Sequence, residues 1–357
     1  MTQRTSLYNR HLDLNAKIIP FSGFDMPVNY AKGILHEYNV VRSKCGIFDV
    51  SHMGQFFISG DKANKFLQNV TINDVSKLKV YDAQYSAMCN TDGGIIDDLI
   101  LYKKPNGYYM VVNAGNIDKN LEWLYNNIID NVQIKNQSSD TSLIAVQGPD
   151  SRKILSEITN ADLYIKFYSY TDTNILDESV MLSRTGYTGE LGFELYGPHE
   201  SIIKIWDKLI DIGVEPCGLA SRDILRIEMK YCLYGNDINE NTNPIEAGLS
   251  WITAINKNTF IGKESMINSN NNSRLVAFRM LDKGIPRHDY EIQFKGEQIG
   301  SVTSGTQSFI LKSGIGLGYI ESQYSKIGSE IDIIIRDKQV RAEVIRPPFI
   351  KNTSLLD

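Results

Sequence analysis

The sequence predicts an α+β protein of two or three domains that ends in a small all-β unit. Three observations support this fold class. The chain has 357 residues, more than one typical core holds. Strand-like runs and amphipathic helices alternate over most of its length without a regular βαβ repeat. Beyond residue 273, only short strands separated by Gly- and Asp-rich turns follow.

A polar stretch at 269–273, Ser-Asn-Asn-Asn-Ser, is the strongest linker signal in the chain. We therefore expect an α+β region over 1–268, built from two intertwined subdomains, and a C-terminal domain over 274–357. The regular spacing of the C-terminal strands is typical of a β-barrel or a jelly-roll-like unit. These strands are expected at 275–280, 290–294, 297–303, 315–320, 331–336 and 340–345.

The first 70 residues alternate between loops and short elements. The segment 20–27 is punctuated by Gly and Pro and reads as a loop. A helix is expected over 30–42 and a strand over 55–60. Asp61 is placed to cap a short helix at 62–68, because an Asp side chain can accept from the first free backbone N–H groups of a helix.

The centre of the N-terminal half is a predicted β-meander. Its strands are expected at 85–89, 95–102 and 107–113, and the first turn, 90–94, contains the Asp-Gly and Gly-Gly pairs that tight hairpins favour. Further helices and strands follow it. The helices are expected at 117–127, 151–158, 201–212 and 219–231, and the strands at 142–146, 180–184 and 192–196.

Two adjacent acids, Asp97 and Asp98, stand at the head of the second meander strand. Asp is depleted in strands, and neighbouring strand residues point to opposite faces. Asp98 therefore shares a face with Tyr102, and Asp97 shares the other face with Leu99. At least one acid is expected to face a group that needs a negative charge. By composition alone, a solvated pair on an edge strand is an equal alternative.

Composition excludes several classes of protein. The net charge of −5 gives no general indication of nucleic-acid binding. No apolar run approaches the roughly 20 residues of a membrane helix, and the N-terminus has no signal-peptide pattern, so a cytoplasmic protein is expected. The four cysteines lack CxxC spacing, and the five histidines lack HExxH spacing. We therefore expect neither a metal site nor a disulfide framework.

An ordered set of segments resembles the glycine cleavage T-protein family, the folate-dependent aminomethyltransferases. Each segment alone is a weak signal, whereas the set in this order is specific and spans nearly the whole chain. The segments are 46–53 (GIFDVSHM), 93–98 (GGIIDD), 146–149 (VQGP), 183–190 (SRTGYTGE), 192–194 (GFE), 218–223 (GLASRD), 225–228 (LRIE), 234–237 (YGND), 241–246 (NTNPIE), 249–251 (LSW), 260–263 (FIGK) and 303–306 (TSGT).

The resemblance implies a cloverleaf-like arrangement of domains around a central folate cleft, and it implies a reaction. The lipoylated H-protein of the glycine cleavage system would be the partner and would present an aminomethyl group on a dihydrolipoyl sulfur. Tetrahydrofolate, the co-substrate, would take up the methylene group as 5,10-methylenetetrahydrofolate, with release of ammonia and dihydrolipoyl H-protein. No metal, nucleic acid or membrane is implied.

The resemblance also implies a set of site residues. Asp98 matches the catalytic acid beside the folate nitrogens, whereas Asp97 is expected to make a turn or edge contact. Glu194 matches the acid that binds the amino-pyrimidine edge, and Arg287 lies where an arginine meets the folate tail or the partner at the cleft mouth. The remaining folate-binding positions are Met53, Tyr85, Tyr102, Val111, Asn113, Tyr187, Arg222 and Tyr231.

Two departures from the family pattern leave the folate tail without an assigned partner. Residues 308–311 read Ser-Phe-Ile-Leu where members often show Ser-Pro-Thr-Leu, and the C-terminus has no aromatic after Phe349. Lys351 is the one candidate there.

Two alternative functions stay open at this point. One is a folate-binding accessory protein of iron–sulfur assembly, whose Lys-Gly-Cys-x-x-Gly-Gln-Glu motif is only partly matched by residues 230–237 (KYCLYGND). The other is a folate-dependent demethylase, which would differ on the donor side of the pocket.

Overall fold

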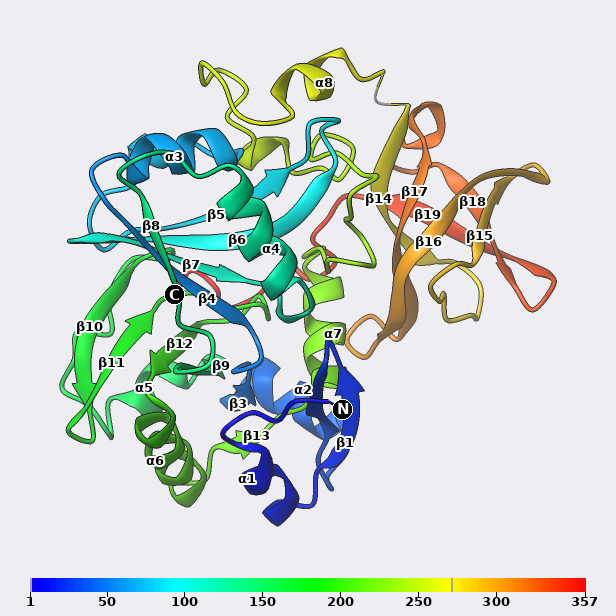
Figure 1. Cartoon of the computed structure of the whole chain (residues 1–357). Coiled ribbons are helices and arrows are strands. Elements are labelled where there is room, and N and C mark those ends of the chain that lie inside the picture. Colours follow the sequence, from blue (N-terminus) through cyan, green and yellow to red (C-terminus); the bar gives the residue numbers. More distant parts are fainter. Residues whose placement is uncertain (1, 271) are drawn as a thin grey trace.

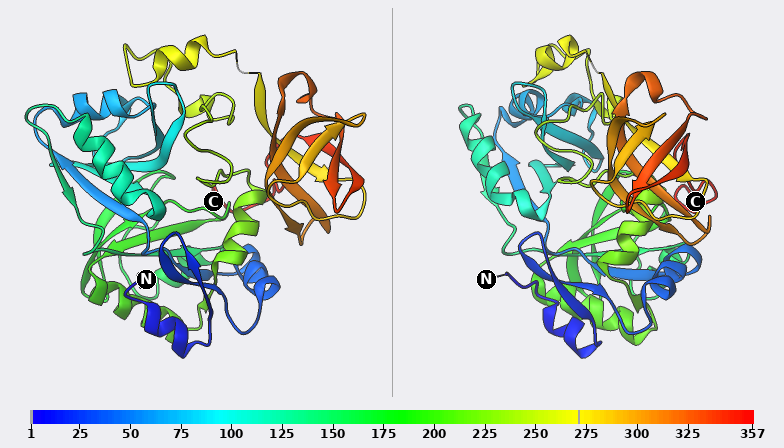
Figure 2. Two further views of the ribbon diagram at one scale, coloured as in Figure 1. Left: turned by 45° about the vertical axis from the view of Figure 1, so that its right-hand side comes forward. Right: turned by 90° about the vertical axis from the view of Figure 1, so that its right-hand side faces the viewer.

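The computed structural model describes residues 2–270 and 272–357 and confirms an α+β fold with a closed C-terminal barrel. Two antiparallel-rich sheets and the barrel are arranged around helix α7 (Leu219–Glu228) (Figure 1). Turned views show α7 between the barrel and the sheets (Figure 2). The cavity that these elements form lies beside this helix, and α7 therefore links the two sheets and the barrel.

A six-stranded sheet forms the base of the N-terminal region, in the order β10-β11-β12-β9-β3-β13. Only the β3–β13 pair is parallel among these described pairs. The strands are β3 (Gly46–Asp49), β9 (Ser142–Gln147), β10 (Tyr170–Ile175), β11 (Glu178–Ser183), β12 (Gly192–Gly197) and β13 (Glu215–Pro216).

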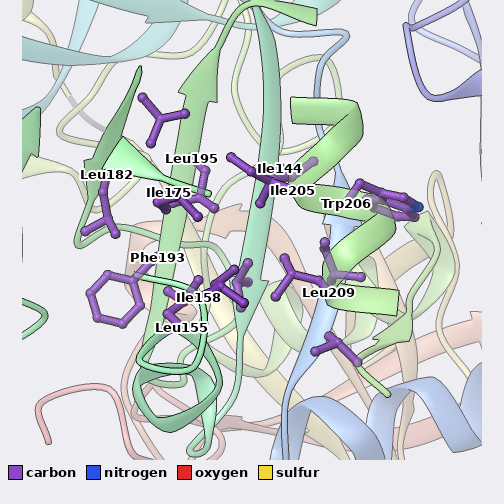
Figure 3. Packing of buried hydrophobic residues seen from close by; sticks show 14 of the residues in the cluster. Ile144, Leu155, Ile158, Ile175, Leu182, Phe193, Leu195, Ile205, Trp206 and Leu209 are labelled. Atoms are coloured by element: carbon purple, nitrogen blue, oxygen red, sulfur yellow. The ribbon is translucent and has the colours of Figure 1, made fainter. Parts of the chain in front are cut away.

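Helix α6 (His199–Asp211) covers one face of this sheet. Its buried residues Ile202, Trp206 and Leu209 recur at helical spacing and share one hydrophobic core with the sheet, and Figure 3 shows Leu209 pointing toward the strands. The short helix α5 (Ser151–Leu155) supplies Leu155 to the same core. Burial of this stripe explains why the predicted amphipathic helix forms here.

A five-stranded antiparallel sheet, in the order β5-β6-β7-β4-β8, stands above the first. It contains the predicted meander as three adjacent strands, and helices α3 (Ala63–Val70) and α4 (Ile117–Asn126) share a core with it. The strands are β4 (Gly54–Ser59), β5 (Ala83–Cys89), β6 (Ile95–Lys104), β7 (Gly107–Val112) and β8 (Gln133–Asn136). The chain thus leaves the six-stranded sheet after β3 and returns to it at β9.

The C-terminal barrel closes in the order β14-β17-β16-β15-β18-β19, with β19 pairing back onto β14. Its strands are β14 (Ser273–Met280), β15 (Glu291–Phe294), β16 (Glu297–Ser308), β17 (Ser313–Glu321), β18 (Glu330–Ile335) and β19 (Lys338–Ile345). Of the predicted linker 269–273, residue 271 lies outside the described residues and Ser273 already belongs to β14. The domain boundaries themselves remain a prediction.

The predicted loop at 20–27 is wrong, because the structure places a hairpin there. Strand β1 (Lys17–Phe21) pairs with β2 (Phe24–Asn29) across a Ser22-Gly23 turn, in which both residues have positive φ (48° and 86°). Helix α1 (Tyr8–Asp13) precedes this hairpin. Within residues 2–270 and 272–357, only an isolated bridge from Gln3 to Phe24 adds to this hairpin, so its prolines interrupt no further strand ladder.

Two predicted helix starts are also wrong. Asp61 does not cap α3, since the helix begins at Ala63 and its N-cap is Lys62, which makes no side-chain capping bond. Helix α2 (Ile34–Ser43) begins later than predicted, because Gly33 has φ of 83°. The remaining elements are α8 (Lys263–Asn268) and the 3₁₀ turns η1 (Val75–Lys77), η2 (Ala114–Asn116), η3 (Ser250–Ile252) and η4 (Ser322–Tyr324).

The C-terminal segment runs from the barrel back to the sheets, where the chain ends (Figure 1). The Phe349 backbone N–H donates to the Glu228 carbonyl at the end of α7 (2.8 Å). Further along, the Ser354 hydroxyl donates to Glu190 (2.7 Å), and Arg184 donates to the Leu355 carbonyl (2.7 Å). The tail therefore joins the barrel to the N-terminal region. In the part of the chain that is described, no helix is both long and apolar enough to cross a membrane.

Candidate functional site

A cavity of about 1290 Å³ lies where the two sheets, the barrel and α7 meet. Its wall takes Asp98 from β6, Val111 from β7, Glu194 from β12, Arg222 from α7 and Thr303 from β16. Residues far apart in the sequence thus converge on one space, and its size suits a ligand with a ring system and an extended chain.

The structure brings together all the predicted site residues except Tyr102. Those that line the cavity are Met53, Tyr85, Asp98, Val111, Asn113, Tyr187, Glu194, Arg222, Tyr231 and Arg287. Tyr102 is fully buried behind the wall, where its hydroxyl lies 3.0 Å from that of Tyr196. The alternation of side chains along the strand correctly placed Tyr102 on the same face as Asp98. However, Tyr196 from the other sheet lines the cavity instead of Tyr102.

Asp98 presents a carboxylate to the cavity. It accepts hydrogen bonds from the Tyr85 hydroxyl (2.9 Å) and from Nδ2 of Asn113 (2.7 Å). Burial nevertheless raises the pKa of Asp98, because removal of water disfavours the charged form more than these two donors favour it. The group is therefore a fixed, poorly solvated carboxylate.

Asp97 makes neither a turn contact nor an edge contact, so that expectation is wrong. Strand β6 lies between β5 and β7, and the Asp97 side chain is fully buried on the opposite face from Asp98. It accepts from the Asn113 N–H (3.1 Å) and from the side-chain amides of Asn113 (2.8 Å), Asn116 (2.7 Å) and Asn120 (2.5 Å). Burial first, and the neighbouring Asp98 charge second, raise the pKa of Asp97 to about 7.

Glu194 and Arg222 provide a second polar pair in the wall. Glu194 is buried and accepts from Thr185 (2.5 Å) and Tyr196 (3.3 Å), both through Oε2. Within the described residues Oε1 accepts no hydrogen bond, and Nη1 of Arg222 is buried without a partner. Burial lowers the pKa of Arg222, and the Glu194 charge opposes this shift. One acceptor and one donor are thus left for a ligand.

Aromatic rings supply flat surfaces on the wall. Tyr187 and Tyr231 stack at 5.6 Å between ring centroids, and the Arg222 guanidinium lies 4.8 Å from the centre of the Tyr187 ring. Tyr85 lies 5.9 Å from Trp251, at an interplanar angle of 32°. Trp251 is 69% exposed, which places it at the rim. Such surfaces suit a planar heterocycle.

Several lining residues escaped the sequence reasoning. His52 is buried, its Nδ1 has no partner among the described residues, and burial lowers its pKa to about 4, so the ring is neutral. His52 and Trp251 both lie inside segments that carry the family resemblance, 46–53 and 249–251, so these segments could have identified them. Tyr168 follows Phe167 in a loop without any motif, and Lys230 looked like the last turn of a helix.

The four cysteines are free and buried. Among residues 2–270 and 272–357, no three His, Cys, Asp or Glu side chains are grouped to hold a metal ion.

Comparisons with known proteins agree over almost the whole chain. The family model described as the GCVT N-terminal domain matches residues 7–257, and the glycine cleavage T-protein C-terminal barrel domain matches 274–351. A curated aminomethyltransferase of Halothermothrix orenii is 43% identical, covering 98% of this chain and 100% of its own. That of Caldanaerobacter subterraneus is 44% identical, covering 98% and 96%.

A solved structure has the same fold. The crystal structure of glycine cleavage system aminomethyltransferase T from Bartonella henselae superposes with a TM-score of 0.94 at 30% identity, and the match covers 99% of each chain. The likeness includes the barrel and both sheets, so the arrangement around the cavity is shared.

Proposed function

The chain belongs to the glycine cleavage T-protein family and is an aminomethyltransferase, and we propose that tetrahydrofolate binds in its central cavity with Asp98 as the catalytic carboxylate. The enzyme transfers the methylene of an aminomethyl group from dihydrolipoyl H-protein to tetrahydrofolate. The products are 5,10-methylenetetrahydrofolate, ammonia and dihydrolipoyl H-protein. The names of the relatives support this reaction over an accessory or demethylase role.

The observation that carries the site proposal is the fixed Asp98 carboxylate in the cavity wall, held by two hydrogen bonds. During transfer, folate N5 and then N10 form bonds to the methylene carbon while its C–N bond to ammonia and its C–S bond to the lipoyl arm break, the leaving groups take up the two folate N–H protons, and positive charge develops on the alkylated nitrogen. A carboxylate held by Tyr85 and Asn113 can offset this charge without reorganising. It also orients the two nitrogens toward the carbon, which lowers the barrier further.

Glu194 and Arg222 are proposed to bind the pterin ring. The amino-pyrimidine edge presents two adjacent N–H groups, and a carboxylate is the matching acceptor. Arg222 keeps a free N–H for the ring carbonyl, while Tyr187 and Tyr231 offer aromatic faces. Met53 and Val111 add apolar contacts on the same wall.

We propose the lipoylated H-protein as the macromolecular partner. Its arm must reach the cavity from solvent, and Arg287 is an exposed cation in the cavity lining at the barrel side. An exposed arginine there is free to meet a carboxylate of either the partner or the folate tail. No other residue is assigned to docking.

Replacing Asp98 with Asn tests the catalytic assignment. We expect the rate of 5,10-methylenetetrahydrofolate formation from aminomethylated H-protein to fall by roughly 100- to 1,000-fold, because the fixed negative charge is lost. The half-exposed Asp172, outside the cavity lining, gives a matched Asp→Asn control that should keep full activity. Activity of D98N near that of the wild type would reject the role.

Glu194→Ala and Arg222→Ala test the binding assignments. Each should raise the Kd for tetrahydrofolate by about 10- to 100-fold, since each removes a charge-assisted hydrogen bond. Fluorescence titration measures this change directly. Unchanged affinity in both variants would mean that the pterin lies elsewhere.

A further inference from the structure

Lys230 has an unusual backbone conformation directly after α7. Its φ is +59°, in the left-handed region. The Tyr231 N–H donates to the Arg226 carbonyl and the Lys230 N–H to the Ile227 carbonyl, each at 2.9 Å. This pattern is a Schellman motif, in which the left-handed position is usually Gly. A lysine there is conformationally unfavourable, so its side chain needs another explanation.

The Lys230 side chain lines the cavity, and local backbone holds it in place. Its Nζ donates to the Ala247 carbonyl at 3.2 Å. The next residue is Gly248, where a Cβ atom would stand only 2.8 Å from Nζ, so the glycine makes room for the ammonium. An ammonium has three N–H donors. Across the described chain, Lys230 makes no other hydrogen bond and no ion pair, so the remaining donors are available to a ligand.

The other cations in the cavity wall are placed differently. Arg226 is committed to Asp237 (2.5 Å) and Asp223 (2.8 Å). Arg222 lies over the Tyr187 ring beside the pterin-binding acid Glu194. A lysine near a helix C-terminus can also serve the helix dipole. Here, however, the ammonium bonds to the 247 carbonyl, outside α7, which argues against that purely structural role.

We propose that Lys230 binds a carboxylate of the glutamate tail of tetrahydrofolate, an inference that rests on the proposed function. The geometry along α7 supports this. Arg222 lies near the start of α7 and Lys230 follows its last residue, Glu228, so about 9 Å of helix and one turn separate them. The pteroyl part of folate spans a comparable length, so a pterin near Arg222 directs its tail toward Lys230. Lys351, the earlier candidate, is exposed and lies outside the cavity lining, which ends at Pro347 and Pro348.

The experiment compares three ligands on one set of variants. Tetrahydropteroate lacks glutamate, tetrahydrofolate carries one, and its pentaglutamate carries five. Kd values are measured by titration calorimetry for the wild type, K230N, K230R and K312N. Asn tolerates positive φ, so K230N removes the charge without backbone strain. Lys312 is an exposed lysine with φ of +51° outside the cavity lining, and K312N is therefore the matched control.

We expect the wild type to bind the glutamylated ligands more tightly than tetrahydropteroate. K230N should lose about five- to twentyfold in affinity for them and keep its affinity for tetrahydropteroate. K230R should retain the preference for glutamylated ligands, and K312N should match the wild type. Added salt should reduce this preference without changing the affinity for tetrahydropteroate.

Two failures are distinguishable. If K230N keeps the wild-type preference, or if K312N loses it equally, the assignment of Lys230 is overturned while folate binding stands. If the wild type binds neither tetrahydropteroate nor tetrahydrofolate, the proposed function itself fails.

Discussion

Asn113 connects the two acids of strand β6. Its side-chain amide donates to Asp98 Oδ1 at 2.7 Å and to Asp97 Oδ1 at 2.8 Å, and its backbone N–H donates to Asp97 as well. Asp97 therefore anchors the residue that holds Asp98, although it does not line the cavity. Both carboxylates are poorly solvated, and the Asp98 charge adds to burial in raising the pKa of Asp97. We therefore propose that Asp97 acts as a positioning residue for the carboxylate assigned to catalysis.

Replacing Asp97 with Asn should shift the pH dependence of the reaction. In the wild type, the pKa of Asp98 is raised, so kcat/KM should fall with decreasing pH well before the ordinary Asp value of 3.8 is reached. Asp97, whose pKa is about 7, is neutral on that limb and ionises only near pH 7, so kcat/KM should change again near pH 7 in the wild type and not in D97N. A rate profile from pH 5 to 8 measures this difference.

The control for D97N is Asn116→Ala, which removes one donor to Asp97 and no charge. It should keep the change near pH 7, moved to higher pH because a donor to the Asp97 carboxylate is lost, and absence of that change in N116A as in D97N would contradict its assignment to Asp97. The change of folding stability with pH also has a definite direction. Because the pKa of folded Asp97 is about 7, above 3.8, the wild type should lose stability as pH rises between these values. D97N should lack that loss.

Helix α7 organises the molecule at the scale of elements. One side of it packs on α2 and the β1–β2 hairpin, and another meets barrel strand β16. Arg226 is buried within this contact, where it bonds Asp237 at 2.5 Å and the Ser304 hydroxyl at 2.7 Å. Asp237 in turn accepts from Thr303 of β16 (2.5 Å). The helix, the 233–238 loop and the barrel are therefore fastened through one buried ion pair.

Arg226→Met should destabilise the fold by about 3–5 kcal/mol, because it leaves Asp237 buried without its cation. Urea unfolding followed by circular dichroism gives the difference. Asp223, the second acidic partner of Arg226, has a side chain that is 46% exposed. Asp223→Ala should therefore lower the free energy of unfolding by less than about 1 kcal/mol. Equal losses of unfolding free energy in the two variants would show that burial of the Arg226–Asp237 ion pair does not govern how much it stabilises the fold.

At the scale of the whole molecule, the C-terminal tail and a buried network join the barrel to the sheets. Arg42 bridges Glu190 (2.7 Å) and Glu228 (2.6 Å). Glu190 also accepts from Ser354 of the tail, and Glu228 accepts from Ser308 of β16 (2.7 Å). A cavity made by three bodies keeps its shape only while these bodies stay together, so the network supports function from a distance.

Deleting residues 349–357 should lower the melting temperature and weaken tetrahydrofolate binding. The deletion removes the buried Phe349 and Ile350 side chains and the Ser354 hydroxyl that Glu190 accepts. Differential scanning calorimetry and folate titration measure the two effects. Leu356→Ala, at a side chain that is 79% exposed, is the control and should change neither. An unaltered melting temperature in the truncated chain would exclude a fastening role for the tail.

Local patterns predicted most elements of the fold. The meander, α4, α6, α7 and all six barrel strands follow from periodicity and turn residues, since those signals act over a few neighbouring positions. The errors at 20–27, Asp61 and the start of α2 arose at Gly- and Pro-rich turns. There, positive φ at Gly23 and Gly33 decided between a loop, a strand and a helix.

The sequence by itself determined the family, the two strand faces of Asp97 and Asp98, and ten of the residues that line the cavity. Only the tertiary structure decided what those faces meet. Asp97 became an anchored internal acid because the β7–α4 connection and α4 bring three Asn side chains to it, and Tyr196 of another sheet lines the cavity where Tyr102 was expected. Alternation sets a side chain's direction, whereas packing of distant segments sets its surroundings, and the charge, solvation and partners of a group depend on those surroundings.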